Sequence, residues 1–153
     1  MALTYRPLAT PDRDFCVLVH HLAMRAYVEP LWGWDEAQQD RLALEFLDHR
    51  DAVHEVVLAD GSPIGYLSYQ NRHDRLCLNK LHLHPQYHNK GFGSEILLRL
   101  IRRADSAAVP IELSVLTTNL RARVFYERHG FFAMQTTAEK VHMHRAVSSV
   151  QPG

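Results

Sequence analysis

The stretch HNKGFGS, residues 88–94, lies between an apolar segment that is predicted to be a strand, residues 75–83, and a predicted amphipathic helix. Gly91 and Gly93 have no Cβ atom, so backbone N–H groups can turn towards a ligand that approaches closely. The helix adds the positive end of its dipole at the same place. Its buried face is predicted to comprise Ile96, Leu97, Leu100, Ile101 and Ala104. The stretch therefore predicts an anion-binding loop, although a glycine-rich turn that serves only the fold would have the same composition.

A second stretch, NLRARVFYERHGF at residues 119–131, follows a predicted strand over residues 110–116. Together the two stretches resemble motifs A and B of the GNAT family of N-acetyltransferases, which read Gln/Arg-x-x-Gly-x-Gly and Asn…Ala…Tyr-Glu-x-x-Gly-Phe. The resemblance covers residues 76–143 and involves order, spacing and residue type at once. It departs from the family at His88, where the motif has glutamine or arginine.

Length and composition predict one domain. The 153 residues are 46% hydrophobic, and we expect a single GNAT-like domain over residues 1–147 and a flexible tail over residues 148–153. Lys and Arg together number 17, as do Asp and Glu, so the formal net charge is zero. Because no basic block stands out, nucleic acid is not an expected partner.

Cysteine content and hydropathy predict a cytoplasmic location. Cys16 and Cys77 have neither the number nor the spacing of a disulfide framework or a zinc site. No apolar run is long enough to cross a bilayer, and the amino terminus lacks the features of a signal peptide. We therefore expect no membrane partner.

Periodicity and turn residues predict the order of the elements. The expected strands cover residues 3–8, 54–59, 62–70, 75–83, 110–116, 131–135 and 140–146, and the expected helices cover residues 11–29, 36–47, 93–104 and 119–129. Asp60-Gly61 is a strong signal for a hairpin turn. This order is similar to that of the GNAT family, which implies an α/β fold of the α+β type: a mixed, mainly antiparallel sheet of about seven strands, flanked by about four helices, with strands four and five splayed.

Capping and periodicity also predict how the first two helices begin, end and pack. Thr10 is expected to cap the first helix and Pro30 to end it, while Asp35 is expected to cap the second. The core-facing stripe of the first helix is expected to be Phe15, Leu18, Val19, Leu22 and Ala26.

The resemblance implies where acetyl-CoA binds. In the family its pantetheine arm lies between strands four and five, bonded to strand-four backbone, and its diphosphate meets the first turn of the next helix. Carried over by position, the cofactor-binding residues are Leu81, His82, Leu83, His88, Asn89, Lys90, Gly91, Phe92, Gly93, Ser94, Asn119 and Arg123. A charged His88 would pair with phosphate, which predicts some pH dependence; a solvated surface histidine is the alternative.

Two residues are candidates for the chemistry itself. The resemblance gives Tyr126 the role of general acid, which protonates the departing CoA thiolate, while a packed aromatic side chain is the alternative. With a strand period of two, one face carries Cys77, Asn79, Leu81 and Leu83. On that face Asn79 could hold a water molecule or the acceptor.

The general base stays open at this point. An amine must be neutral to attack, and neither Cys77 nor Asn79 is a good base. The other candidates are Glu29, Asp35, Glu112 and His142.

In the family the first two helices, their connection and the final hairpin build the acceptor pocket. The resemblance thus implies as acceptor-binding residues Tyr27, Glu29, Trp32, Trp34 and Asp35. An aromatic wall with carboxylates suits a cationic amine. Alternatively, the tryptophans hold the helix connection on the core and Asp35 merely caps a helix.

Histidine is abundant, with 11 residues, and two pairs lie two residues apart: His82 with His84, and His142 with His144. Such pairs can bind zinc, but no third ligand is identifiable from the sequence. We therefore expect solvated or hydrogen-bonded histidines and no metal.

These observations predict an N-acetyltransferase that moves acetyl from acetyl-CoA to a primary amine by direct attack in a ternary complex. Because strand four has no carboxylate, the alternative is a non-catalytic acyl-CoA-binding or regulatory module of the same fold. The expected partner is a small-molecule or peptide amine. The sequence leaves open the acceptor's identity, a longer acyl donor and a homodimer.

Overall fold

One seven-stranded sheet forms the centre of the molecule. The computed structural model describes residues 2–148; residue 1 and residues 149–153, which include most of the expected tail, lie outside the described residues. The strands are β1 (Leu3–Pro7), β2 (Val53–Ala59), β3 (Ser62–Asn71), β4 (Leu76–Leu83), β5 (Ile111–Leu116), β6 (Phe132–Thr136) and β7 (Lys140–Arg145). Their order is β1-β2-β3-β4-β5-β7-β6, and only the β4–β5 pair is parallel. The predicted fold class is confirmed.

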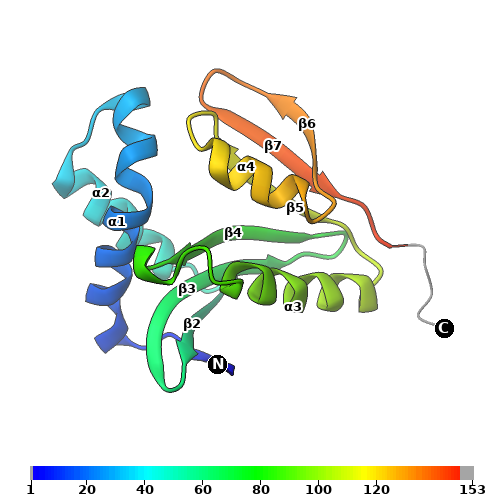
Figure 1. Ribbon diagram of the computed structural model, residues 1–153, viewed down its shortest axis with the longest axis horizontal. Helices are drawn as coiled ribbons and strands as arrows, with labels where there is room; N and C mark the ends of the chain where they lie inside the picture. Colours follow the sequence, from blue (N-terminus) through cyan, green and yellow to red (C-terminus); the bar gives the residue numbers. More distant parts are fainter. Residues whose placement is uncertain (1, 149–153) are drawn as a thin grey trace.

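Four α-helices cover this sheet, as Figure 1 shows. They are α1 (Arg13–Trp32), α2 (Glu36–Leu47), α3 (Phe92–Ser106) and α4 (Leu120–Glu127), with short 3₁₀ turns at Thr10–Asp12 and Pro85–Tyr87. Helices α1 and α2 lie together, while α3 and α4 each follow a strand of the parallel pair. Across residues 2–148 no helix has the length and apolarity to span a membrane.

The ends of α1 differ from the sequence-based expectation. Thr10 is not its cap but opens a 3₁₀ turn, which Asp12 closes by accepting a hydrogen bond from the Ala9 N–H at 2.8 Å. Pro30 lies inside the helix, which runs on to Trp32 because a proline near the end removes little hydrogen bonding. Gly33, with φ +73°, ends the helix instead. Asp35 caps α2 as predicted, accepting from the Gln38 N–H at 3.0 Å.

The buried stripe of α1 is also rotated from the predicted one. Its buried residues are Cys16, Val19, His20 and Val28. Leu18 and Leu22 instead remain about half exposed, at 50% and 48%. Apolar spacing alone did not show that His20 would belong to the buried face, because a histidine was counted as polar.

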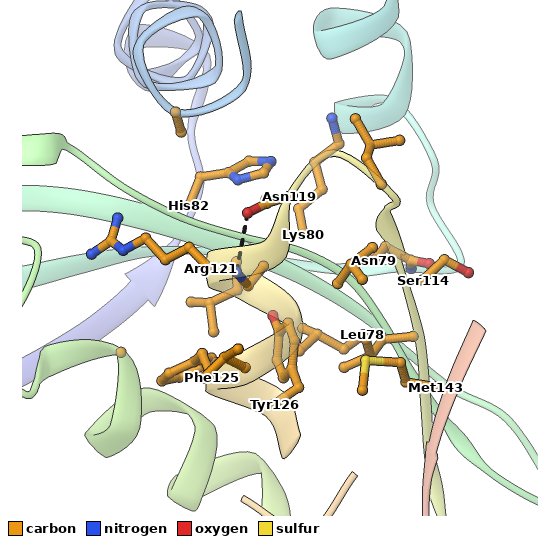
Figure 2. Close-up of a pocket in the computed structure, with 18 of the residues that line it drawn as sticks. Leu78, Asn79, Lys80, His82, Ser114, Asn119, Arg121, Phe125, Tyr126 and Met143 are labelled. Atoms are coloured by element: carbon orange, nitrogen blue, oxygen red, sulfur yellow. Dashed lines mark hydrogen bonds between the residues drawn. The ribbon is translucent and has the colours of Figure 1, made fainter. Parts of the chain in front are cut away.

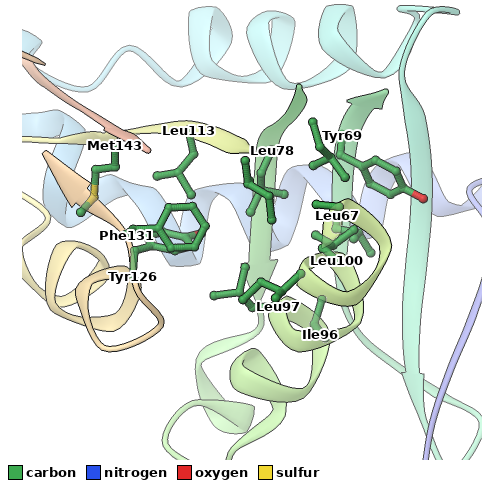
Figure 3. Packing of buried hydrophobic residues seen from close by; sticks show 14 of the residues in the cluster. Leu67, Tyr69, Leu78, Ile96, Leu97, Leu100, Leu113, Tyr126, Phe131 and Met143 are labelled. Atoms are coloured by element: carbon green, nitrogen blue, oxygen red, sulfur yellow. The ribbon is translucent and has the colours of Figure 1, made fainter. Parts of the chain in front are cut away.

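The core has two parts on opposite faces of the sheet. Adjacent residues of a strand point to opposite faces, so Tyr66 packs with α1 and α2 while Leu67 packs with α3. Figure 3 shows the larger part, where α3 and α4 side chains meet the strands. The α3 residues predicted to be buried are so: Ile96, Leu97, Leu100, Ile101 and Ala104.

Strands β4 and β5 separate almost as soon as they pair. Only Leu76 with Ile111 and Cys77 with Glu112 are in register, and the strands then diverge, as Figure 1 shows. From there to Leu83, β4 has β3 on one side and no strand on the other. The predicted splay is therefore present, and it begins at Cys77.

A bulge in β4 lies just beyond that point. Ser68 pairs with Lys80 and Tyr69 with Leu78, so two steps along β4 match one step along β3. Asn79 is the extra residue, and a single inserted residue reverses which face the later side chains occupy.

The bulge overturns the prediction that Cys77, Asn79, Leu81 and Leu83 share a face. The β4 residues in the α3-side core are Leu76 and Leu78 before the bulge, and Leu81 and Leu83 after it. Lys80 and His82 therefore turn towards α1 and α2, where Lys80 contacts the Phe46 ring and His82 the Tyr66 ring.

We predict that Leu100→Ala will destabilise the protein by about 2–5 kcal/mol, because its fully buried side chain would leave a cavity. Leu98 lies on the same helix with 40% exposure, so Leu98→Ala should cost less than about 1 kcal/mol. Urea unfolding measures both free energies. Equal losses would contradict the described orientation of α3.

Candidate active site

The separation of β4 and β5 opens a cleft with a volume of about 1420 Å³. Strands β4, β5 and β7, the first turns of α3 and α4, and part of α1 line it, and Figure 2 shows many of these side chains. The cleft thus reaches both motifs of the sequence.

The free edge of β4 presents backbone groups to this cleft. Hydrogen bonds of an antiparallel strand alternate between its two sides, and the His84 N–H donates to the Ile64 carbonyl of β3 at 2.8 Å. The backbone groups of Leu81 and Leu83 must then face away from β3. In agreement, the Leu83 carbonyl accepts a hydrogen bond from the His88 ring at 2.9 Å.

The loop before α3 has the shape of an anion cradle. Gly91, with φ +84°, precedes the first turn of α3, and nothing lies within 4 Å of the place where its Cβ would be. A Cβ at Gly93 would lie 3.4 Å from the Phe125 ring, so that glycine brings α3 close to α4. Gly91, Gly93 and Ser94 line the cleft. The first-turn N–H groups of α3 are therefore accessible to an anion.

Two members of this loop lie away from the cleft lining, contrary to expectation. The Phe92 side chain is 8% exposed and packs in the core, and Lys90 is exposed to solvent. Phe92 can contribute only its backbone to the cradle.

His88 is used internally rather than as a free cation. Its Nε2–H donates to the Leu83 carbonyl, and its Nδ1 accepts from Arg121 Nη1 at 2.5 Å. Burial, and then Arg121, lower the pKa of His88, so the ring is neutral. Its expected pairing with phosphate in a charged form is not supported by this geometry.

Arg121 supplies the positive charge that was expected from His88. It lies in the first turn of α4, lines the cleft, and also donates to the Asn89 side chain at 3.2 Å. Sequence reasoning missed it because it is more than 25 residues from the glycine loop; only the family order of motifs could have indicated their proximity.

Asn119 caps α4 by accepting from the Ala122 N–H at 3.0 Å, and it lines the cleft. Arg123 does not line the cleft, because its position on α4 directs it to Glu127, 3.8 Å away. Of the two cofactor-binding residues expected from motif B, Asn119 lines the cleft and Arg123 does not.

Tyr126 lies on α4 with its ring against Phe125 and Phe131. The ring is buried, which raises the pKa of the phenol and keeps it protonated at neutral pH. Tyr126 is among the side chains that line the cleft, as Figure 2 shows. A protonated phenol in this place can donate a proton.

A polar row crosses the sheet where β4 and β5 part. Asn79 donates to Gln70 at 3.2 Å, and Figure 2 shows Asn79 and Ser114 at the same part of the cleft. Ser114 Oγ lies 2.6 Å from His142 Nδ1 on β7. Glu112 also lines the cleft but is paired with Arg75 at 3.3 Å.

Of the expected acceptor residues only Tyr27 lines the cleft. The structure places the other four elsewhere: Glu29, Trp32, Trp34 and Asp35. Glu29 pairs with Arg25 at 3.1 Å, and Trp34 packs against the His20 and His21 rings. The cleft lining thus lacks Trp32, Trp34 and Asp35 of the helix connection, and α1 presents Ala23, Met24 and Tyr27 to it. These four residues therefore do not form the expected aromatic and acidic wall of this cleft.

The other wall on the α1 side carries Lys80, His82 and His20. Burial lowers the pKa of Lys80 to about 8. Burial, followed by Lys80 and His20, lowers the pKa of His82 well below its usual value. Throughout residues 2–148, no cluster of three or more histidines, cysteines or carboxylates has a metal-binding arrangement.

The class of protein follows from this fold and these motifs: the acetyltransferases. The family model "Acetyltransferase (GNAT) family" matches residues 17–131, more than half of the chain. The chain belongs to this family, and the resemblance noted from its sequence is confirmed. None of the curated proteins matches the chain by sequence.

Solved structures share the fold at low identity. A PaiA N-acetyltransferase from Thermoplasma acidophilum in complex with coenzyme A has TM-score 0.78 and 19% identity, over 95% of this chain and 99% of that one. An acetyltransferase from Thermus thermophilus has TM-score 0.75 and 17% identity, over 95% of this chain and 97% of that one. A spermidine N-acetyltransferase chimera from Vibrio cholerae and hSSAT has TM-score 0.69 and 20% identity, over 95% of this chain and 96% of that one.

We predict that His82→Gln will weaken the pH dependence of stability. The lowered pKa of His82 keeps it neutral when folded, while the unfolded chain takes up this proton near pH 6.5. Stability is therefore complete above that pH and falls below it, by up to about 1.4 kcal/mol per pH unit for this group. Urea unfolding between pH 5 and 8 measures the slope, with the exposed His73→Gln as control. An unchanged slope in His82→Gln would contradict the prediction.

Proposed function

We propose that this protein transfers acetyl from acetyl-CoA to a primary amine by direct attack in a ternary complex. The observation that carries the proposal is the cleft itself, which joins an anion cradle, a free strand edge and a protonated phenol. Each of these parts has a distinct task.

The cradle and the strand edge fit the donor. Acetyl-CoA is a long, anionic molecule that would bring a reactive thioester. The α3 first turn and Arg121 suit its diphosphate. The outward-facing backbone of Leu81, which has no strand partner on the cleft side, suits an amide-containing arm because it can form strand-like hydrogen bonds. Asn119 lies near the junction of these regions.

Tyr126 is proposed as the general acid. Transfer of acetyl to the amine releases a thiolate, which needs a proton. The raised pKa of the phenol leaves that proton available at neutral pH, and the side chain lines the cleft.

His142 is proposed as the general base, with Ser114 as its positioning residue. If Nδ1–H donates to Ser114 Oγ, Nε2 keeps the lone pair that takes a proton from the amine. Of the other candidates, Glu29 and Asp35 lie outside the cleft and the Glu112 carboxylate is engaged by Arg75. Asn79, which lies at the same part of the cleft as Ser114, is proposed to hold the acceptor or a water molecule.

We predict that Tyr126→Phe will lower kcat by roughly 10²–10⁴-fold while leaving acetyl-CoA affinity unchanged, because it removes only the acid. Gly91→Asp should abolish binding and turnover, since it adds a negative charge to the cradle. CoA release with a panel of amines, and calorimetry with acetyl-CoA, separate the two effects. Tight binding without release by the wild type would favour the non-catalytic module.

We predict that His142→Gln will lower kcat with alkylamines by roughly 10²-fold or more. Glutamine can keep a hydrogen bond to Ser114, so a loss would reflect the base rather than packing. Exogenous imidazole should restore part of the rate in His142→Gly but not in Tyr126→Phe. Full activity of His142→Gln would assign the base elsewhere.

A further inference from the structure

The charges in the cleft are unbalanced although the chain as a whole is neutral. Among the described residues that line the cleft, the charged ones are Arg75, Lys80, Arg121, Arg128, Lys140 and a single carboxylate, Glu112. The whole sequence has 17 charges of each sign. The excess of cations is therefore local to the cleft, and it indicates anionic ligands.

The proposed donor accounts for only part of this excess. Arg121 lies in the first turn of α4 and reaches the cradle through His88 and Asn89, while Arg128 is the C-cap at the other end of that helix. The remaining cations lie on β4, β7 and the turn before β4, on the α1 side of the sheet or at its edge. A CoA diphosphate in the cradle does not neutralise them.

Lys80 on β4 and Lys140 on β7 belong to the part of the cleft where the acceptor is proposed to bind, called here the acceptor side, and they have no counter-charge. Arg75 is paired with Glu112 at 3.3 Å and with Asp74 at 3.6 Å. Within residues 2–148, neither Lys80 nor Lys140 has a carboxylate within 4.0 Å. Once the Arg75–Glu112 pair is discounted, the acceptor side carries two unmatched positive charges.

Lys80 is stronger evidence for an anionic ligand than Lys140, because Lys80 is partly buried and Lys140 is exposed. Its ammonium lies 5.4 Å from the centre of the Phe46 ring, and Figure 2 shows the side chain rising from β4 towards α2. The nearby Cys16 thiol cannot be its counter-ion, since burial raises the pKa of that thiol to about 12. Burying a cation without an anion is costly, so a site that does so has a reason to bind one.

Two neighbouring histidines add hydrogen-bonding groups without adding charge. His82 and His20 have ring centroids 6.0 Å apart and both line the cleft. His20 Nε2–H donates to Gln39 Oε1 at 2.9 Å, so its buried Nδ1, which has no partner in the described part of the chain, is an acceptor. The Lys80 ammonium is therefore the group in this wall that suits an anion.

We propose that the acceptor is an amine that also carries a carboxylate, with the carboxylate at Lys80 and the amine at the Asn79–His142 row. The inference rests on the proposed acetyl transfer and names its substrate class. An amino acid, or a small peptide with a free carboxyl end, has this chemistry. A polyamine does not, because its extra ammonium groups would meet the unmatched lysines.

The test compares matched acceptors in the CoA-release assay. Glycine, β-alanine, 4-aminobutyrate and several L-amino acids are each paired with the corresponding carboxamide, and spermidine serves as the polycation. For the acceptors that are used, the free acids should have at least tenfold higher kcat/KM than the amides. The change should lie mainly in KM.

Three variants identify the residue responsible. Lys80→Gln should bring the acid-to-amide ratio close to one, mainly by raising KM for the acids, whereas Lys80→Arg should keep most of the preference because it keeps the charge. Arg41→Gln, an exposed residue of α2 outside the cleft, is the charge-matched control and should leave the ratio unchanged.

The outcomes separate the inference from the function on which it rests. Equal use of acids and amides by the wild type, or a preference for spermidine, would overturn the carboxylate proposal and leave acetyl transfer intact. A preference for acids that persists in Lys80→Gln would overturn the assignment to Lys80. No CoA release with any amine would overturn the proposed function, and the inference with it.

Discussion

The early end of the β4–β5 pairing is the constraint on which the rest of the structure depends. Backbone N–H and C=O groups normally find partners in a sheet, yet beyond Cys77 one edge of β4 faces a cleft. The sheet remains intact because α3 and α4 pack a continuous apolar layer beneath both halves. A ligand can therefore enter between two strands without disrupting the core.

The bulge at Asn79 lets β4 place apolar side chains in the core on one face and polar side chains on the other face. Leucines on either side of it fill the α3-side core, and the residues after it on the opposite face are Lys80 and His82. Without the inserted residue, strict alternation would place Lys80 in the apolar layer. The same insertion puts Asn79 at the point where β4 and β5 separate. The bulge therefore affects both the packing of β4 and the residues that line the cleft.

Sequence reasoning predicted the sheet, its hairpin, the glycine loop and the Asn119 cap, because these depend on local chemistry and on motif order. The predictions were wrong where contacts between residues distant in the sequence determine the structure. No period in residues 75–83 reveals a bulge, which becomes visible only in the pairing with β3. Likewise the Trp32–Asp35 connection was expected to form a pocket wall, but α1 continues past Pro30 to Trp32, and Trp32, Trp34 and Asp35 do not line the cleft.

His88 joins elements that are distant in sequence: its ring bonds β4 through Leu83 and α4 through Arg121. The cradle is thereby held in place before any anion arrives, so less conformational entropy remains to be lost on binding. The two sequence motifs are also energetically linked, because a change in Arg121 removes a partner of His88. In the proposed site, the glycine loop and the α4 arginine would therefore act as one thermodynamic unit, with non-additive effects of substitutions on affinity.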